Sequence, residues 1–345
     1  MNIFLDDNGG QALHPFTLTR HPADIRVGIL TIREKWEKLT GLKIFTDKNF
    51  LNDESIVINP TLIPTHLNYE QVIQAAKDGQ PLEETPHIKF LRHPWHIFQY
   101  NDWALRHDFQ LLTQDRSSQP ISGSNQLNGR EHIFLEEGAV VEHCILNAST
   151  GPIYIGKDAQ LMEGCLIRGP FSIGEKAVLK MGTKVYGATT LGPYCVGGGE
   201  IKNSVLFAYS NKAHDGYLGD SVLGEWCNLG AGTSNSNVKN TGGDVKYIRD
   251  AHNNSTAAGN KAGLLMGDYS RAAINTSFNT GTIVGVCCNV FGNPPAKFVN
   301  NFSWGSERYI FEKALTDIAN WKKMKGEEVT ADEKSLLLDI YTNHQ

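Results

Sequence analysis

The chain has little of what several large protein classes require. Its 345 residues include 32 lysines and arginines against 37 aspartates and glutamates, a net charge of -5 with a pI near 6.2. This balance does not supply the concentrated basic surface of a protein that binds nucleic acid. No apolar run approaches a membrane span, and the first residues, MNIFLDDNGG, contain no apolar stretch of signal-peptide length. We therefore expect a cytoplasmic protein that binds neither nucleic acid nor a membrane.

The cysteines and histidines do not form the pattern of a metal site. The six cysteines are Cys144, Cys165, Cys195, Cys227, Cys287 and Cys288. Their spacing is not that of metal ligands, and most stand where a small apolar residue is wanted. No second histidine lies near His214 at the close spacing that a zinc site requires. The sequence predicts reduced thiols in the core and no metal site.

An aliphatic residue recurs at every sixth position through the middle of the chain. The positions are Ile155, Leu161, Ile167, Ile173, Leu179, Val185 and Leu191, and the frame resumes with Met266, Ala272, Phe278, Val284 and Val290. A period of six fits neither an α-helix nor an alternating strand. Gly156, Gly174 and Gly192 are eighteen residues apart, so three hexads form one coil with tight glycine turns. The pattern predicts a left-handed parallel β-helix of triangular section, with aliphatic side chains stacked inside.

Two regions of different texture flank these hexapeptide repeats. Residues 1–118 mix short apolar runs with helical stretches at 30–39 and 69–77, which is typical of an α/β domain. Residues 305–345 are predicted to be helical, and Thr330 with Glu333 forms a capping box. We therefore predict an α/β domain (1–118), a β-helix domain (119–304) and C-terminal helices (305–345). The polar stretch between Val238 and Gly263 predicts a long loop that projects from the coil.

Segment 197–237 interrupts the hexad pattern and places Lys202, His214 and Tyr217 within sixteen residues. It contains EIK (200–202), KAHDGYLGD (212–220) and NLGAGTSNSN (228–237). At this mutual spacing these pieces resemble the acetyltransferase domain of the bifunctional GlmU family, which makes UDP-N-acetylglucosamine. The resemblance implies an enzyme that transfers acetyl from acetyl-CoA, its co-substrate, to the amine of an amino-sugar 1-phosphate such as glucosamine 1-phosphate.

The amine of an amino sugar titrates near the α-amino range, about 7.7–8.0, so at neutral pH it needs a base, and histidine suits that role. By the resemblance, His214 is this general base, and Glu200 orients the amine or the imidazole. The positions that match substrate-binding residues are Lys184, Lys202, Tyr217, Asn228, Asn237 and Lys261. The backbone of Gly230, Ala231 and Gly232 approaches the thioester of acetyl-CoA, where a main-chain N–H can meet the developing oxyanion.

The sequence departs from the family pattern at two lysines. Lys184 stands where the family has an arginine, and a lysine supplies charge without a bidentate fork for phosphate. Lys261 matches a second family lysine only across an insertion of about one coil, in which Lys246 and Arg249 compete for the same role. The identity of the amino sugar therefore stays open.

The resemblance also implies a homotrimer, because the family places each active site between subunits. From the residues, Val141, Leu206, Phe207 and Tyr209 are apolar side chains that need cover, and we expect a neighbouring subunit to supply it.

Residues 1–40 resemble a reduced form of the sugar nucleotidyltransferase start, with a strand at 3–5 and a remnant loop at 7–10. The glycine-threonine-arginine signature is absent, and Asp6 and Asp7 crowd the place meant for phosphates. We therefore expect nucleotidyl transfer to be absent or very weak, with Mg²⁺ needed only if it is retained. Arg20 and Arg26 either bind an anion or, the favoured interpretation, pair with Asp24 and Glu34 at the surface. A working nucleotidyltransferase with a regulatory β-helix and a non-catalytic scaffold remain alternatives.

Overall fold

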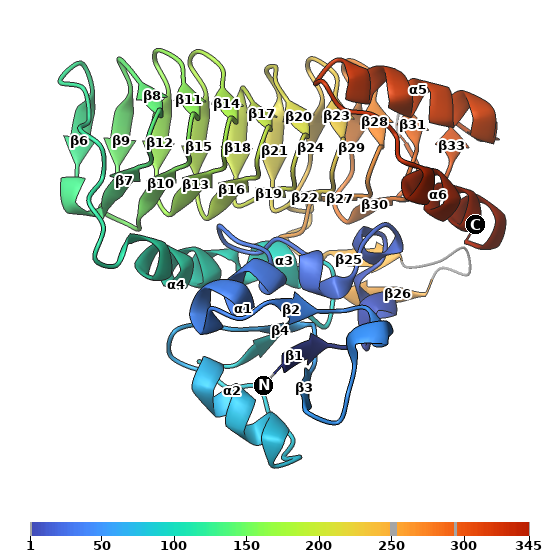
Figure 1. Cartoon of the computed structure of the whole chain (residues 1–345). Coiled ribbons are helices and arrows are strands. Elements are labelled where there is room, and N and C mark those ends of the chain that lie inside the picture. Colours follow the sequence, from blue (N-terminus) through green and yellow to red (C-terminus); the bar gives the residue numbers. More distant parts are fainter. Residues whose placement is uncertain (1, 249–253, 293–294, 345) are drawn as a thin grey trace.

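Short parallel strands stack into three walls around a triangular core in the computed structural model, which describes residues 2–248, 254–292 and 295–344 (Figure 1). The covered wall, named for the N-terminal part that packs on it, contains β7 (Ile133–Leu135), β10 (Ile153–Ile155), β13 (Phe171–Ile173), β16 (Thr189–Leu191), β19 (Val205–Leu206), β22 (Val222–Leu223), β27 (Leu264–Met266), β30 (Thr282–Val284) and β32 (Phe298–Val299). The fold class predicted from the sequence is confirmed.

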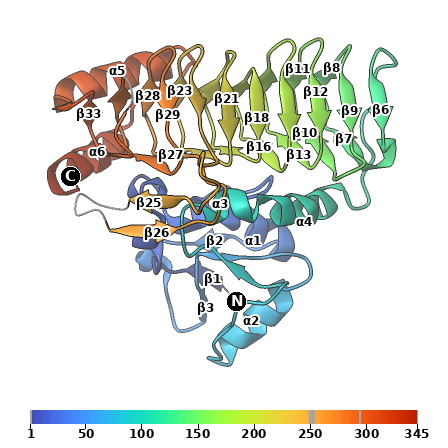
Figure 2. The same ribbon diagram turned by 180° about the vertical axis from the view of Figure 1, so that it is seen from behind.

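The tail wall is the second side and carries the C-terminal helices over its last strands (Figure 2). It contains β8 (Val140–Val141), β11 (Gln160–Leu161), β14 (Val178–Leu179), β17 (Val196–Gly197), β20 (Asn211–Lys212), β23 (Asn228–Leu229), β28 (Arg271–Ala272), β31 (Asn289–Val290) and β33 (Ser303–Trp304), with β34 (Glu307–Arg308) antiparallel at its edge. The helices are α5 (Phe311–Lys323) and α6 (Ala331–Asn343), and the predicted capping box opens α6.

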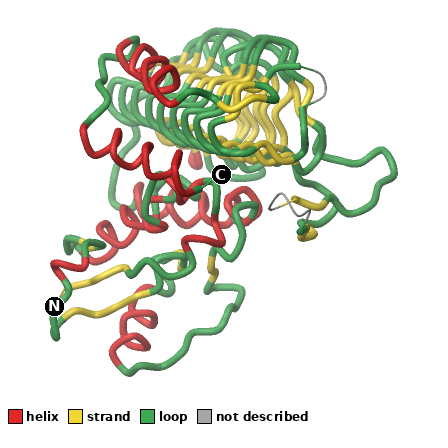
Figure 3. Tube along the Cα trace, turned by 90° about the vertical axis from the view of Figure 1, so that its right-hand side faces the viewer, coloured by secondary structure: helices red, strands yellow, loops and turns green. Residues whose placement is uncertain are grey.

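The open wall is the third side, and the outward side chains of Ile145 and Leu166 on its first strands are each 43% exposed. It contains β6 (Gln126–Asn128), β9 (Ile145–Asn147), β12 (Leu166–Arg168), β15 (Lys184–Tyr186), β18 (Glu200–Lys202) and β21 (Tyr217–Gly219). Further along the same side, β24 (Ser234–Asn235) pairs with β29 (Ser277–Phe278). Turned by 90°, the coils lie one behind another (Figure 3).

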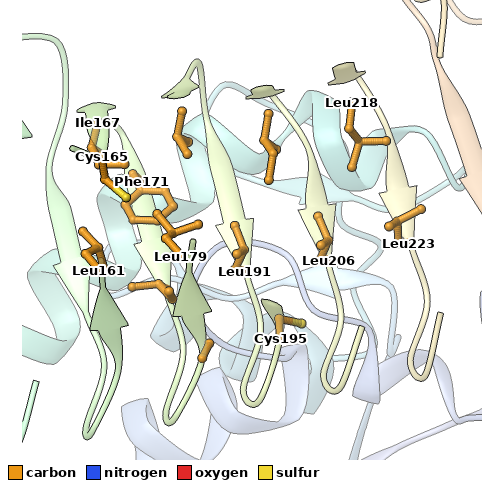
Figure 4. Close-up of a cluster of buried hydrophobic side chains, with 14 of the residues drawn as sticks. Leu161, Cys165, Ile167, Phe171, Leu179, Leu191, Cys195, Leu206, Leu218 and Leu223 are labelled. Atoms are coloured by element: carbon orange, nitrogen blue, oxygen red, sulfur yellow. The ribbon is translucent and has the colours of Figure 1, made fainter. Parts of the chain in front are cut away.

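The hexad frame decides which side chains point inward. Ile155, Leu161 and Ile167 lie on the covered, tail and open walls in turn, and each is at most 2% exposed. The partners in the next coil are eighteen residues on, so Ile155 pairs with Ile173 and Leu161 with Leu179. Figure 4 shows Leu161, Ile167 and Leu179 between the walls, where the inward side chains form one continuous apolar core.

The coil that precedes His214 is two residues shorter than the coil that contains it, because Gly197 pairs with Lys212, fifteen residues on, and Asn211 with Asn228, seventeen residues on. Between the tail and open walls, the inward residues Gly197 and Ile201 are four residues apart, whereas Lys212 and Leu218 in the next coil are six apart. The strands still pair in register, because Gly197 faces Lys212 and Ile201 faces Leu218. The corner at 198–199 is therefore two residues smaller than the corner of His214 that stacks on it.

The N-terminal part builds a small parallel sheet in the order β2-β1-β3 and packs it, through helices, on the covered wall (Figure 1). Its elements are β1 (Asn2–Leu5), η1 (Gly10–Leu13), η2 (Phe16–Leu18), η3 (Pro22–Asp24), α1 (Ile32–Thr40), β2 (Ile44–Phe45), η4 (Lys48–Phe50), β3 (Ser55–Ile58), β4 (Leu62–Ile63), α2 (Tyr69–Lys77), β5 (Lys89–Phe90), α3 (His96–Gln99) and α4 (Asn101–Thr113). The outward side chains of Val205, Val222, Leu265 and Ile283 belong to the same apolar cluster as this sheet. The N-terminal part and the covered wall therefore share one core.

The stretch between Val238 and Gly263 leaves the coil as predicted but does not project freely. It contains a hairpin of β25 (Lys246–Ile248) and β26 (Ser255–Ala257). Tyr247 is fully buried and stacks on Trp95, with ring centroids 5.2 Å apart, and Gln99 donates a hydrogen bond to the carbonyl oxygen of Ala258 at 2.9 Å. The insertion thus joins the β-helix to the N-terminal part.

One of the two expected surface ion pairs is wrong. Arg20 does not pair with Asp24; it pairs with Glu225 at 2.8 Å and with Asp268, both on the β-helix, because the N-terminal part buries its guanidinium against that surface. Only Arg26 makes the expected pair, at 3.4 Å from Glu34.

The apolar residues expected to need a second subunit are covered by their own chain. Val141 and Leu206 lie in the core, and Phe207 packs on Phe16, with ring centroids 5.5 Å apart. Tyr209 stacks between Tyr194 and Trp226, at centroid distances of 4.7 and 4.2 Å. Val141, Leu206 and Phe207 are therefore buried within the subunit, and Tyr209 is partly covered by its neighbours.

Candidate functional site

His214 lies at the corner where the tail wall turns into the open wall, between β20 and β21, and its side chain is exposed. The smaller corner beside it carries Gly198 and Gly199. A Cβ at Gly198 would lie 2.4 Å from the carbonyl oxygen of Ala213, and one at Gly199 would lie 2.8 Å from that of His214. The two corners can stack only because the smaller one has no side chains.

The predicted cofactor-binding segment forms the same corner one coil further on. The backbone N–H of Gly232 donates to the carbonyl oxygen of Asp215 at 3.0 Å, so Gly230, Ala231 and Gly232 lie directly beside the His214 corner. Ala231 and Gly232 are exposed, and Gly232 has a φ of +74°, which favours glycine. The structure therefore brings the predicted base and the predicted thioester-binding backbone together.

Three predicted site residues form a row on the open wall at the strand ends next to this corner. Lys184 is the register partner of Glu200, and Glu200 is the partner of Tyr217. Lys184 is exposed, whereas Glu200 and Tyr217 are half-buried. The hydroxyl of Tyr186 donates to Glu200 Oε1 at 2.5 Å, and this hydrogen bond raises the pKa of Tyr186 to about 12. Glu200 is thus held by a neighbour that the sequence had not indicated.

Asn237 joins this row through Tyr217. Its amide nitrogen donates to the Tyr217 hydroxyl at 3.1 Å and also to the buried carboxylate of Asp220. The Tyr217 ring lies over Gly219, where a Cβ would be 2.2 Å from the phenol oxygen. Burial and the charge of Asp220 raise the pKa of Tyr217 above its usual value. Tyr217 is therefore a neutral hydroxyl that can bind a substrate hydroxyl or phosphate oxygen.

The remaining substrate-binding candidates differ in how near they lie to this row. Lys202, half-buried on the open wall, holds its ammonium 5.9 Å from the centroid of the Tyr186 ring. Lys261 is exposed and follows the hairpin, where the next residue, Ala262, donates its N–H to the Asn237 carbonyl oxygen at 2.9 Å. Asn228 is separate, because it faces outward on the tail wall. Lys246 is exposed on β25, and Arg249 lies outside the described residues.

Sequence reasoning missed three residues that hold this site. Tyr186 binds Glu200, Asp220 binds Asn237, and Lys212 contacts the backbone at His214. Asp220 and Lys212 belong to the KAHDGYLGD motif, so the motif could have indicated these two residues. Lys212 also occupies a position that the hexad frame reserves for an aliphatic residue.

A cavity of about 770 Å³ lies elsewhere, between the N-terminal part and the last strands of the covered wall. Its lining includes His14, Trp95, Phe298 and Asn301, and none of the predicted site residues. Among the residues described, no three histidine, cysteine or acidic side chains are grouped as a metal site, and no helix is long and apolar enough to cross a bilayer.

Comparison with known proteins finds a family model that matches the N-terminal part and relatives that are GlmU-like. Residues 2–85 and 48–117 match the family model described as sugar nucleotidyl transferase. The bifunctional protein GlmU of Methanocaldococcus jannaschii is 33% identical over 89 residues, which are 26% of this chain and 21% of that protein. The resemblance to GlmU-like proteins is confirmed.

A bifunctional sugar-1-phosphate nucleotidylyltransferase/acetyltransferase of Sulfurisphaera tokodaii is 27% identical over 213 residues, 60% of this chain and 45% of the relative. The chain thus spans less than half the length of each of these two GlmU-like relatives. The solved UDP-N-acetylglucosamine acyltransferase from Campylobacter jejuni shares 9% identity over 66% of this chain and 97% of that one, with a TM-score of 0.30. The Sulfurisphaera tokodaii relative and the family model are both named as transferases, the class predicted for this chain.

Proposed function

We propose that the chain is a cytoplasmic, acetyl-CoA-dependent N-acetyltransferase that acts on an amino-sugar 1-phosphate. The observation that supports this most is the stacking of the His214 corner on the Gly230–Gly232 corner, at the end of the row formed by Lys184, Glu200 and Tyr217. A base, a glycine backbone and polar groups for a sugar phosphate thereby lie along one edge of the open wall. The similarity to GlmU-like proteins supports the same chemistry.

In the proposed reaction the amine of the sugar attacks the thioester carbonyl of acetyl-CoA. His214 accepts the proton that the amine loses, and Glu200 orients the amine or the imidazole. The carbonyl oxygen becomes an oxyanion, which a main-chain N–H of the Gly230–Gly232 segment stabilises. The C–S bond then breaks, coenzyme A leaves as a thiolate that takes up a proton, and the new C–N bond forms the amide.

Lys184, Lys202 and Lys261 are proposed to neutralise the phosphate, and Tyr217, Asn228 and Asn237 to bind oxygen atoms of the sugar phosphate. Asn228 is on the tail wall, so a single subunit does not gather all of these groups. We therefore propose a homotrimer in which neighbouring subunits complete each site. Exposed aliphatic residues on the open wall, Ile145 and Leu166, each 43% exposed, give a partner something to cover. Light scattering that gives a monomer mass at micromolar concentration would contradict the trimer.

The test is acetyl-CoA turnover against a panel of amino-sugar phosphates, measured by release of free thiol. We expect His214→Ala to lower turnover by about 100- to 10,000-fold, the usual contribution of a positioned base. Acetyl-CoA binding, measured by calorimetry, is expected to persist. His143→Ala is the matched control, because His143 is an exposed histidine at the equivalent corner of an earlier coil. Absence of acetyl-CoA binding in the wild type would leave the scaffold alternative.

A second candidate, sugar-1-phosphate nucleotidyl transfer, is supported by the family match of residues 2–117. The loop after β1 does not fit a phosphate cradle well, because Asp7 pairs with Lys48 at 3.1 Å and Asn8 binds the carboxylate of Asp6. We therefore expect little or no pyrophosphate from UTP, Mg²⁺ and N-acetylglucosamine 1-phosphate. Release at tens per second, a rate ordinary for enzymes, would favour this candidate.

A further inference from the structure

Lys212 places an ammonium group inside the apolar core of the β-helix. It is 1% exposed and occupies the inward position of the tail wall that Leu179 holds two coils earlier and Leu229 one coil later. The preceding residue, Asn211, points outward, since its side-chain oxygen accepts a hydrogen bond from Lys325 at 3.1 Å. Successive side chains of a strand point to opposite faces, so Lys212 points inward.

The ammonium group contacts backbone at two neighbouring corners. Nζ donates to the carbonyl oxygen of Gly198 at 3.1 Å and to the carbonyl oxygen of His214. Within the described part of the chain, no carboxylate forms an ion pair with it. Burial lowers the pKa of Lys212 to about 8, with the charge of Asp215 acting in the opposite direction. The stack would accept leucine here, so a lysine is not needed to fill the core.

The two corners that Lys212 joins differ in length. The corner at Gly198 is two residues smaller than the corner at His214, so their backbones do not repeat each other. The lysine amine reaches both carbonyl oxygens from inside and binds them together. Its target at the longer corner is the carbonyl of His214 itself.

We propose that Lys212 is a positioning residue that holds the His214 corner from within the β-helix and thereby sets the place of the imidazole. The proposal rests on the proposed function only in calling His214 the base. The positioning itself is a statement about the corner and is tested without turnover.

The experiment follows the His214 imidazole by NMR in protein with ¹³C-labelled histidine, where the signal missing from His214→Gln identifies it. Lys212→Met keeps the aliphatic stem and removes the amine. Lys212→Leu restores the residue type of Leu179 and Leu229, so it provides a second variant that preserves the core. We expect both variants to shift the His214 signal and its titration midpoint. Lys176→Met, at an exposed corner lysine, is the matched control and is expected to change neither.

Turnover supplies the second readout. We expect both Lys212 variants to lower kcat by about 10- to 100-fold, because a displacement of about 1 Å costs on that order, with the KM for acetyl-CoA changed less than about threefold. An unmoved His214 signal in folded Lys212→Met and Lys212→Leu proteins would overturn the proposal, and so would an unchanged kcat. A shifted His214 signal in a protein whose wild type transfers no acetyl group would support the positioning and reject the proposed function.

Discussion

The covered wall and the open wall are built from the same repeat, yet their outward side chains have different surroundings. Both have an inward row of mainly aliphatic residues and parallel pairing in register. They differ outward, where the covered wall presents Val205, Val222 and Leu265 and the open wall presents Lys184, Glu200 and Tyr217. The inward residues therefore form the β-helix, and the outward residues decide whether a wall packs on the rest of the chain or stays open.

The comparison predicts that truncating an outward apolar residue is costly on one wall and cheap on the other. Phe207, 1% exposed beside the covered wall, packs on Phe16 of the N-terminal part. We expect Phe207→Ala to lower the free energy of unfolding by about 3–5 kcal/mol. Met181→Ala, at the corner where the tail wall turns into the open wall and where the side chain is 70% exposed, is expected to cost less than about 1 kcal/mol. Chemical denaturation followed by tryptophan fluorescence measures both, and equal losses would show that the walls do not differ in this way.

The same contrast applies to charge. Arg20 is an ion-pair partner of Glu225 and Asp268 across the covered side of the molecule, whereas Arg106 pairs with Asp102 on an exposed helix surface at 2.6 Å. We expect Arg20→Met to cost about 3 kcal/mol of unfolding free energy, because it leaves Asp268 buried without its cation. Arg106→Met is expected to cost about 0.5 kcal/mol or less. A thermal midpoint that falls no further for Arg20→Met than for Arg106→Met contradicts the buried pairing.

A pH measurement on Lys212 tests the corner between the tail and open walls. Its pKa is about 8 in the folded chain, against about 10.4 in an unfolded one. Below pH 8 the Lys212 amine is protonated in both the folded and the unfolded chain, so the folded chain carries the full free-energy cost of burying the charge. Between these values the folded chain has lost the proton and the unfolded chain has not, so stability rises with pH.

The wild type should therefore gain about 2–3 kcal/mol relative to Lys212→Met between pH 8 and 10.5, measured as the difference between their free energies of unfolding. Comparing the two proteins at each pH removes the titration of all other groups. A difference that stays constant over this window would mean that Lys212 is not desolvated.

The sequence could predict the β-helix because its core is a local pattern. From Ile155 to Leu191 each inward residue follows the last by six positions, so Ile155, Leu161 and Ile167 reveal the three walls without any knowledge of distant contacts. The partners of Arg20 could not be predicted in this way. Glu225 and Asp268 lie more than two hundred residues away, and nothing local distinguishes a buried arginine from one that pairs with Asp24.

The candidate site was partly predictable for a related reason. His214, Glu200 and Tyr217 stand in contiguous motifs, and register alone brings them to one edge. The separation of Asn228 follows from which wall its strand joins, and that depends on coil lengths in a segment where two residues are missing from one corner. The supporting bonds from Tyr186 and Asp220 come from side-chain directions that spacing does not encode.

The smallest expected effect concerns the hydroxyl of Tyr217 on the open wall. Tyr217→Phe removes an oxygen that accepts one hydrogen bond from Asn237, while Asp220 still holds the Asn237 amide. If that oxygen binds the sugar phosphate, we expect kcat/KM for the sugar substrate to fall by about three- to tenfold, the value of one hydrogen bond near 1 kcal/mol, with the KM for acetyl-CoA unchanged. Tyr194→Phe is the matched control, since its ring stacks on Tyr209 away from the site. Equal kinetics for the two variants would mean that the open wall does not bind the sugar through Tyr217, and the row of Lys184 and Glu200 would have to bind it without this hydroxyl.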